Sequence, residues 1–170
     1  MESRFTVGLL VANKVGVLYR VAGLFAKRNY NIESIAVGET ENPEYSRMTI
    51  VSTGDEYIRE QVLKQLNKLY DVKKVTLLHD DDSITREHAL IKLNVDNSTS
   101  KKVTELMNQY GGKVMDLFND SITIEITENS DMIDKFIEDV KDIGILEVCR
   151  SGSISLSQGS RNLFTVKDLL

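Results

Sequence analysis

Apolar residues recur along the chain with two different periods, and the change of period marks the expected elements. Residues 5–11 form an apolar run with the composition of a β-strand, and a short polar loop containing Gly16 follows it. Beyond this loop the apolar residues adopt helical spacing, at Val17, Leu18, Val21, Ala22 and Phe25. The pattern predicts a strand, a loop and a helix that begins near Val17.

The rest of the first half continues this alternation. Two β-rich runs, residues 31–40 and 45–53, flank a turn that contains Pro43. Asp55 is a candidate N-cap for a second helix, and residues 72–78 form a fourth apolar strand. The order βαββαβ is that of ferredoxin-like folds, in which both helices cover one face of an antiparallel sheet.

The second half repeats this order. The expected elements are a strand, a helix, two strands, a helix capped by Asn129 or Ser130, and a last strand, at residues 89–95, 98–110, 113–118, 121–127, 130–143 and 145–149. The predicted fold class is therefore α+β, with two ferredoxin-like βαββαβ domains in tandem.

The segments outside these elements are polar. Asp80, Asp81 and Asp82 are predicted to form part of a solvated linker and not a metal site, since three adjacent carboxylates cannot all face one ion in a regular element. The Ser- and Gly-rich stretch at 150–159 keeps Ile154 and Leu156 in alternation. It is expected to extend the last strand or to lie against a partner.

Composition narrows the function classes. The 170 residues carry a formal net charge of -5 with acids and bases interspersed, which argues against a nucleic-acid partner. Cys149 is the only cysteine, and its apolar surroundings predict a small buried side chain. The N-terminus lacks the layout of a signal peptide, and no apolar run reaches the roughly 20 residues of a membrane span. We therefore expect a cytoplasmic protein that does not enter a membrane.

The loop before the first helix is the best candidate for binding. The first turn of a helix leaves N–H groups unpaired at the positive end of the dipole, and Gly16 lets a ligand approach the backbone. Side-chain amides of Asn13 and Asn31 can meet both an ammonium and a carboxylate group, which an amino acid carries together. The alternative is that Asn13 and Gly16 only make the turn and that Asn31 only starts the second strand.

Motifs of catalysis are missing from the sequence. It contains no Ser-His-acid or Cys-His set, no phosphate-binding Walker loop and no HExxH pair. His79 and His88 have no recognised ligand spacing and are expected at the surface.

Several blocks of residues, in order, resemble the small regulatory subunit of acetolactate synthase. They are Asn31–Ser34, Ser46–Ile50, Gly54–Asp55, Leu69–Val72, Arg86–Lys92 and Cys149–Gly152. The resemblance implies an ACT domain at 1–79 for effector binding and dimerisation, an acidic linker at 80–85, an ACT-like domain at 86–160 for activation of the catalytic subunit, and a tail at 161–170.

This resemblance also implies a non-catalytic role. In that family a separate large subunit holds thiamine diphosphate, magnesium and usually FAD, and it joins two 2-oxo acids with loss of carbon dioxide. The small subunit contains no cofactor; it raises the activity of the large subunit and confers feedback inhibition by a branched-chain amino acid, typically valine. We therefore expect a homodimer that partners the large subunit.

Carried over position by position, the effector site comprises two groups of residues. Asn13, Gly16, Val17 and Leu18 come from the first loop, and Asn31 and Ile32 come from the start of the second strand. In similar ACT dimers the two groups belong to different subunits. Asn29 replaces a glycine usual in the family, and asparagine tolerates the left-handed conformation that glycine permits.

Two alternatives remain open. The chain could be an ACT-type amino-acid sensor that serves a different enzyme. It could also be an RNA-binding protein, since RRM domains share the βαββαβ order. That second alternative predicts stacking aromatic residues on the central strands, yet residues 31–37 and 48–53 contain none.

Overall fold

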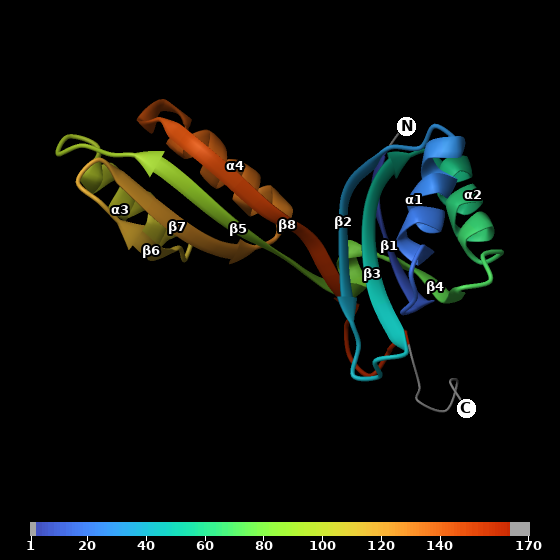
Figure 1. The fold of residues 1–170 in the computed structure, drawn as a ribbon. Helices are drawn as coiled ribbons and strands as arrows, with labels where there is room; N and C mark the ends of the chain where they lie inside the picture. Colours follow the sequence, from blue (N-terminus) through green and yellow to red (C-terminus); the bar gives the residue numbers. More distant parts are fainter. Residues whose placement is uncertain (1–2, 164–170) are drawn as a thin grey trace. The chain divides into compact units, whose positions relative to one another are not determined.

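The computed structural model describes residues 3–163, which form two compact units (Figure 1). In the described chain, the first unit comprises residues 3–84 together with 153–163, and the second comprises residues 85–152. Each unit contains a four-stranded antiparallel sheet, with strand orders β2-β3-β1-β4 and β6-β7-β5-β8. The expected pair of βαββαβ domains is confirmed.

The elements of the first unit closely follow the sequence pattern. They are β1 (Ser3–Ala12), α1 (Val17–Lys27), β2 (Ile32–Glu39), β3 (Tyr45–Gly54), α2 (Glu56–Leu66), β4 (Val72–Leu78) and a short 3-10 turn, η1 (Asp80–Asp82). Asp55 caps α2, accepting a 2.8 Å hydrogen bond from the Ile58 N–H at its carboxylate. Asn29 has a φ of 58° after α1, in the left-handed region expected for it.

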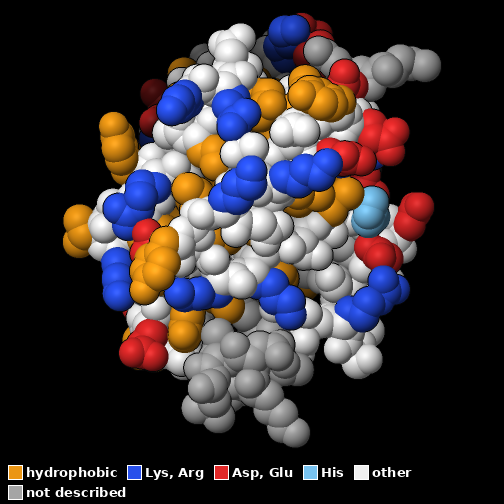
Figure 2. Space-filling view, turned by 90° about the vertical axis from the view of Figure 1, so that its right-hand side faces the viewer, with side chains coloured by type: hydrophobic (Ala, Val, Ile, Leu, Met, Phe, Trp, Pro, Cys, Tyr) orange, Lys and Arg blue, Asp and Glu red, His pale blue; other side chains and the backbone are white. Residues whose placement is uncertain are grey.

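Both helices of the first unit cover one face of its sheet (Figure 1). The core between them is built from alternate residues of β1 and β3 and from the apolar stripes of the helices, including Val7, Leu9, Ile50, Val21, Phe25, Val62 and Leu66. The outer side of this helical layer is rich in Lys and Arg (Figure 2), although the whole chain is acidic.

Residues 153–163, which we call the C-terminal segment, belong to the first unit. Leu163 is buried and packs directly on Gly8 of β1, where an added Cβ would lie 2.8 Å from Leu163 Cδ1. Arg47 Nη2 donates a 2.7 Å hydrogen bond to the Ser155 carbonyl. Leu10, Val51 and Leu78 are buried although they lie outside the helix-side core, and the segment contributes to covering this second face of the sheet.

The elements of the second unit are β5 (Ser83–Asn94), α3 (Ser100–Gln109), β6 (Lys113–Leu117), β7 (Ser121–Glu128), α4 (Ser130–Val140), the 3-10 turn η2 (Lys141–Ile143) and β8 (Ile145–Ser157). Two of its strands are shared with the first unit, since β5 begins there and β8 ends there. The Asn129 side chain accepts a 2.9 Å hydrogen bond from the Met132 N–H, so Asn129 caps α4 and Ser130 does not. The core of the second unit joins β5 and β7 to both helices, with Tyr110 and Phe136 in edge-to-face contact.

Three expectations about the segments between and after the elements differ from the structure, and a fourth lies partly outside the described residues. A six-residue linker at 80–85 is absent, because Asp80–Asp82 form η1 and β5 already begins at Ser83. Asp82 is not simply solvated, since its carboxylate accepts a 2.8 Å bond from Arg161. Residues 153–160 pack with the first unit and not with the second. The tail expected at 161–170 is described only to Leu163, so Phe164–Leu170 lie outside the described residues.

Cys149 was expected to be buried and is exposed. Its strand, β8, is the edge strand of the second sheet, so the apolar run around Cys149 has a partner on one side only among the described residues. His79 and His88 are exposed as expected. The last strand extends to Ser157, which is one of the two alternatives expected for the stretch that contains Ile154 and Leu156.

Candidate functional site

The loop between β1 and α1 presents backbone donors. Gly16 is the N-cap of α1, with a φ of 85° and no side-chain cap, and the first turn contains no acidic residue. The N–H groups of Leu18 and Tyr19 have no acceptor in the part of the chain that the structure describes. This is the arrangement that attracts an anion to a helix N-terminus.

Asn13 is held by the turn that follows β2. Its Nδ2 donates a 3.1 Å bond to Glu39 Oε2 and a 2.9 Å bond to the Pro43 carbonyl, while its backbone N–H donates to the Glu44 carbonyl. The donor half of the amide is therefore used within the chain. The acceptor Oδ1 is the half that a ligand ammonium group can reach.

The other residues expected at this loop have different roles. Val17 is 3% exposed and its side chain belongs to the helix-side core, so only its backbone can face a ligand. Leu18 is 47% exposed beside the loop and offers an apolar contact.

Asn31 and Ile32 lie at the opposite end of the same sheet. Ile32 pairs with Ser52, which pairs with Phe5 of β1, whereas the loop leaves β1 after Ala12. Seven residues of strand separate these levels, or about 23 Å at about 3.3 Å per residue. One chain therefore does not bring the two halves of the expected site together.

Sequence reasoning missed two charged residues at the loop. Arg20 lies one helical turn after Gly16, and its Nη1 is 3.3 Å from the position of a Cβ at Gly16; its Nη2 pairs with Asp71 Oδ2 at 2.6 Å. The i,i+4 spacing from Gly16 was a usable signal for Arg20. Glu39, the partner of Asn13, had no such signal because it depends on the register of the sheet.

Comparison with known proteins matches both units. Residues 8–74 match the model of the AHAS small subunit-like ACT domain, and residues 86–159 match that of the small subunit of acetolactate synthase. The chain is 41% identical to the probable acetolactate synthase small subunit of Methanothermobacter thermautotrophicus over 92% of this chain and 94% of that protein.

The chain belongs to the acetolactate synthase small-subunit family. The Haemophilus influenzae acetolactate synthase small subunit is 40% identical over 94% of this chain and 99% of its own length. The crystal structure of the acetolactate synthase small subunit from Thermotoga maritima superposes with a TM-score of 0.86 at 35% identity, covering 94% of this chain and 99% of that one. The resemblance and the ACT domain inferred from the sequence are confirmed.

Within the second unit, Arg150 of the block Cys149–Gly152 forms an ion cluster. Arg150 binds both carboxylate oxygens of Glu87, Nε to Oε1 at 2.8 Å and Nη2 to Oε2 at 2.7 Å, and it also pairs with Asp134. Glu87 is 4% exposed and accepts a further 2.8 Å bond from the Ser130 hydroxyl. The hydrogen bonds to Glu87 raise the pKa of Arg150 above its ordinary value, so the cluster stays charged.

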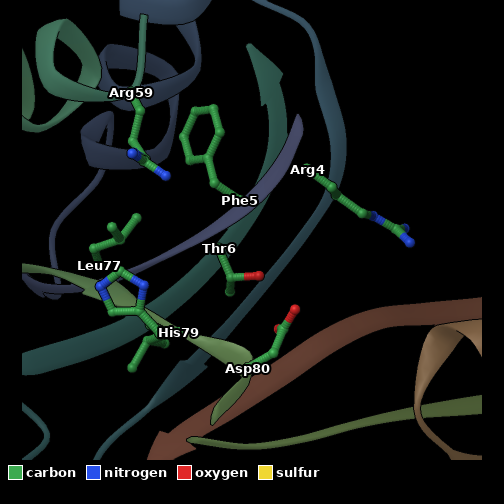
Figure 3. Close-up of a pocket in the computed structure, with 8 residues that line it drawn as sticks. Arg4, Phe5, Thr6, Arg59, Leu77, His79 and Asp80 are labelled. Carbon is green, nitrogen blue, oxygen red and sulfur yellow. The ribbon is translucent and has the colours of Figure 1, made fainter. Parts of the chain in front are cut away.

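A small cavity of about 120 Å³ lies at the end of the first unit's sheet where β1 begins (Figure 3). Arg59 of α2 extends beside Phe5, and His79 and Asp80 lie past the end of β4 (Figure 3). None of the expected effector residues lines this cavity.

Residues 3–163 contain neither a candidate metal site nor a membrane-spanning helix. No group of three or more His, Cys, Asp or Glu side chains there is placed to hold a metal ion. Among the helices so described, none has the length and apolar character needed to cross a membrane.

Proposed function

We propose that this chain is a homodimeric regulatory subunit that activates the large subunit of acetolactate synthase. It also confers feedback inhibition by a branched-chain amino acid, for which valine is the first candidate. Family membership and the ACT domain support the regulatory role. On this proposal thiamine diphosphate, magnesium and FAD belong to the large subunit.

One observation carries the location of the effector. The first sheet has β2 at its edge, with Ile32 at one end of that strand and Glu39 at the other. When two β2 edges pair about a two-fold axis, the strands run antiparallel and the Ile32 end of one copy meets the Glu39 end of the other. Because Asn13 bonds to Glu39, its loop then faces Asn31 and Ile32 of the second copy.

We call the place where the loop before α1 faces Asn31 and Ile32 of the second copy the junction, and its chemistry suits an aliphatic amino acid. The N–H groups of Leu18 and Tyr19 receive the carboxylate, whereas the Arg20 guanidinium beside them is already paired with Asp71. Asn13 Oδ1 and the side chain of Asn31 in the second copy receive the ammonium group. Leu18 and Ile32 contact the branched side chain, and valine bound in this way spans two copies.

Binding between two copies provides the means of regulation. A ligand that contacts both copies favours the dimer arrangement in which the junction is closed, and it shifts the population toward that state. The large subunit is inhibited because the closed state activates it less than the open state does.

The test is the rate of acetolactate formation by the matching large subunit, with and without this chain, across a valine titration. We expect a higher rate with the chain and its suppression by valine. In Gly16→Asp the new carboxylate repels that of valine, so activation persists and inhibition is lost. Gly23→Asp is the control, since Gly23 lies inside α1, which Gly16 precedes as N-cap, and has nothing within 4 Å of an added Cβ; it should keep both properties.

Three results would contradict parts of the proposal. Equal inhibition of the wild-type and Gly16→Asp chains would remove the effector from this loop. If the chain is monomeric at the protein concentration of the assay, the junction between two copies does not form and cannot be the effector site. Valine binding without any change in the rate would mean that the ACT domain serves a different enzyme.

A further inference from the structure

A second and larger cavity, of about 510 Å³, lies within the first unit between the β2–β3 turn and the C-terminal segment. Its volume falls in the range of small-molecule sites, roughly 300 to 1,000 Å³. The residues that line it belong to two stretches of chain and to β3: Glu39, Thr40 and Glu41; Leu156, Ser157, Gly159, Arg161, Asn162 and Leu163; and Arg47.

Arg47 is the unusual member of this lining. Its guanidinium lies over β1, with Nη2 3.5 Å from the position of a Cβ at Gly8, and Nη2 donates a hydrogen bond to the Ser155 carbonyl. Burial lowers the pKa of Arg47, and no carboxylate among residues 3–163 forms an ion pair with it. A partly desolvated guanidinium with donors to spare is stabilised by an anion, most of all by a carboxylate.

The other charges of the cavity select among anions. Glu39 and Glu41 carry negative charge beside it, which disfavours a simple anion and favours a ligand that also carries a cation. Arg161 also lines the cavity, but Asp82 neutralises its guanidinium. Among residues 3–163, the lining therefore offers one guanidinium without an ion pair, that of Arg47, and the two carboxylates of Glu39 and Glu41.

Apolar contacts come from the C-terminal segment. Leu163 is 5% exposed and forms part of the floor, whereas Leu156 is 60% exposed. An aliphatic side chain placed against Leu156 removes apolar surface of both partners from water.

We propose that this cavity is a second amino-acid site, separate from the loop before α1, which binds a zwitterionic aliphatic amino acid. Arg47 binds the carboxylate, Glu39 and Glu41 bind the ammonium group, and Leu156 and Leu163 contact the side chain. None of the residues expected in the effector site lines this cavity.

One hydrogen bond links the two sites. Glu39 Oε2 accepts a 3.1 Å bond from Asn13 Nδ2, so an ammonium group at Glu39 competes with the amide that positions the loop. This coupling rests on the proposed function. Through the contact, each site changes the affinity of the other, and the effect is reciprocal.

The test is calorimetric titration of the full chain with L-valine, L-leucine and the corresponding 2-oxo acids. The Gly16→Asp background removes the loop site, and the binding that remains belongs to the cavity. In that background we expect Glu41→Gln and Leu156→Asp each to weaken binding about tenfold or more, since each removes a partner of the ligand. The 2-oxo acids, which lack the ammonium group, should bind at least about tenfold more weakly than the amino acids.

Matched controls lie beside both residues. Glu44→Gln removes the same charge from the same turn without touching the cavity, and Ile154→Asp changes a residue 59% exposed on the same strand as Leu156. Both should bind as the parent does. All four positions are exposed, so a loss of binding cannot be attributed to unfolding.

Two outcomes would overturn the second site. In one, the Gly16→Asp chain binds no amino acid; in the other, Glu41→Gln and Leu156→Asp bind as tightly as their controls. Equal binding of amino and 2-oxo acids would overturn the pairing of the ammonium group with the glutamates. Failure of the proposed function is a separate result, because Gly16→Asp would then leave valine inhibition of the holoenzyme unchanged.

Discussion

The side chain of Asn13 donates a 3.1 Å hydrogen bond to Glu39, and this bond joins the loop before α1 to the last residue of the edge strand β2. Loop and edge are thereby fixed to each other within one chain. A movement of the β2 edge is therefore transmitted to the loop without an intermediate element.

Asn13→Ala removes this bond and the free Oδ1 together. We expect the valine concentration for half-maximal inhibition to rise about tenfold or more, because a hydrogen bond to a charged ligand group is worth about 1.5 to 3 kcal/mol. Activation in the absence of valine should not change. Asn67→Ala, which removes an exposed amide bonded to the Leu63 carbonyl, is the control and should leave inhibition unaltered.

Arg150→Met leaves the buried carboxylate of Glu87 without its charged partner. Breaking a buried pair typically costs about 3 to 5 kcal/mol, and the lower end applies because Arg150 keeps 31% of its side chain exposed. Urea unfolding followed by circular dichroism measures the loss in the free energy of unfolding. Arg86→Met, at an exposed position on the same strand as Glu87, should change it by less than about 0.5 kcal/mol.

Gly54→Ala forces a new methyl group against Ile58. The added Cβ would lie 2.6 Å from Ile58 Cγ2, so we expect a loss of about 1 to 3 kcal/mol in the free energy of unfolding. Gly23→Ala, inside α1 with nothing within 4 Å, should instead stabilise by about 0.5 to 1 kcal/mol. Equal effects at the two positions would contradict the packing at Gly54.

Asp96 organises the turn before α3. Hydrogen bonds from the Ser98 hydroxyl and from Thr99 to its carboxylate lower its pKa to about 2. A carboxyl group whose pKa is lowered by folding stabilises the fold above its unfolded pKa of about 3.9 and loses that contribution as the pH falls through its folded value. We expect the Asp96 resonance to titrate near pH 2 by NMR and the start of α3 to fray between about pH 4 and pH 2. Titration of Asp96 near pH 4 would count against these bonds.

Local signals in the sequence were sufficient for much of the fold. Asp55 and Asn129 mark helix starts because an N-cap needs only a side-chain acceptor three residues before an N–H. The left-handed conformation of Asn29 was expected from the resemblance and not from a local signal, because the family usually has glycine there and asparagine tolerates that conformation.

Features that depend on distant parts of the chain escaped prediction. Cys149 was misplaced because burial within an apolar strand depends on whether that strand lies at an edge. The loop before α1 could be proposed as a binding loop from Gly16, but its link to Glu39 depends on the register of three strands. Arg47 reads as an ordinary charged residue of a strand until the C-terminal segment covers it.

The contact between Gly8 and Leu163 has a consequence for synthesis on the ribosome. The first unit begins to emerge before the second, yet its sheet gains the cover of Leu163 only when nearly all of the chain has been translated. Until then the nascent chain presents Leu10, Val51 and Leu78 without that cover. The part of the protein that is made first is therefore completed last.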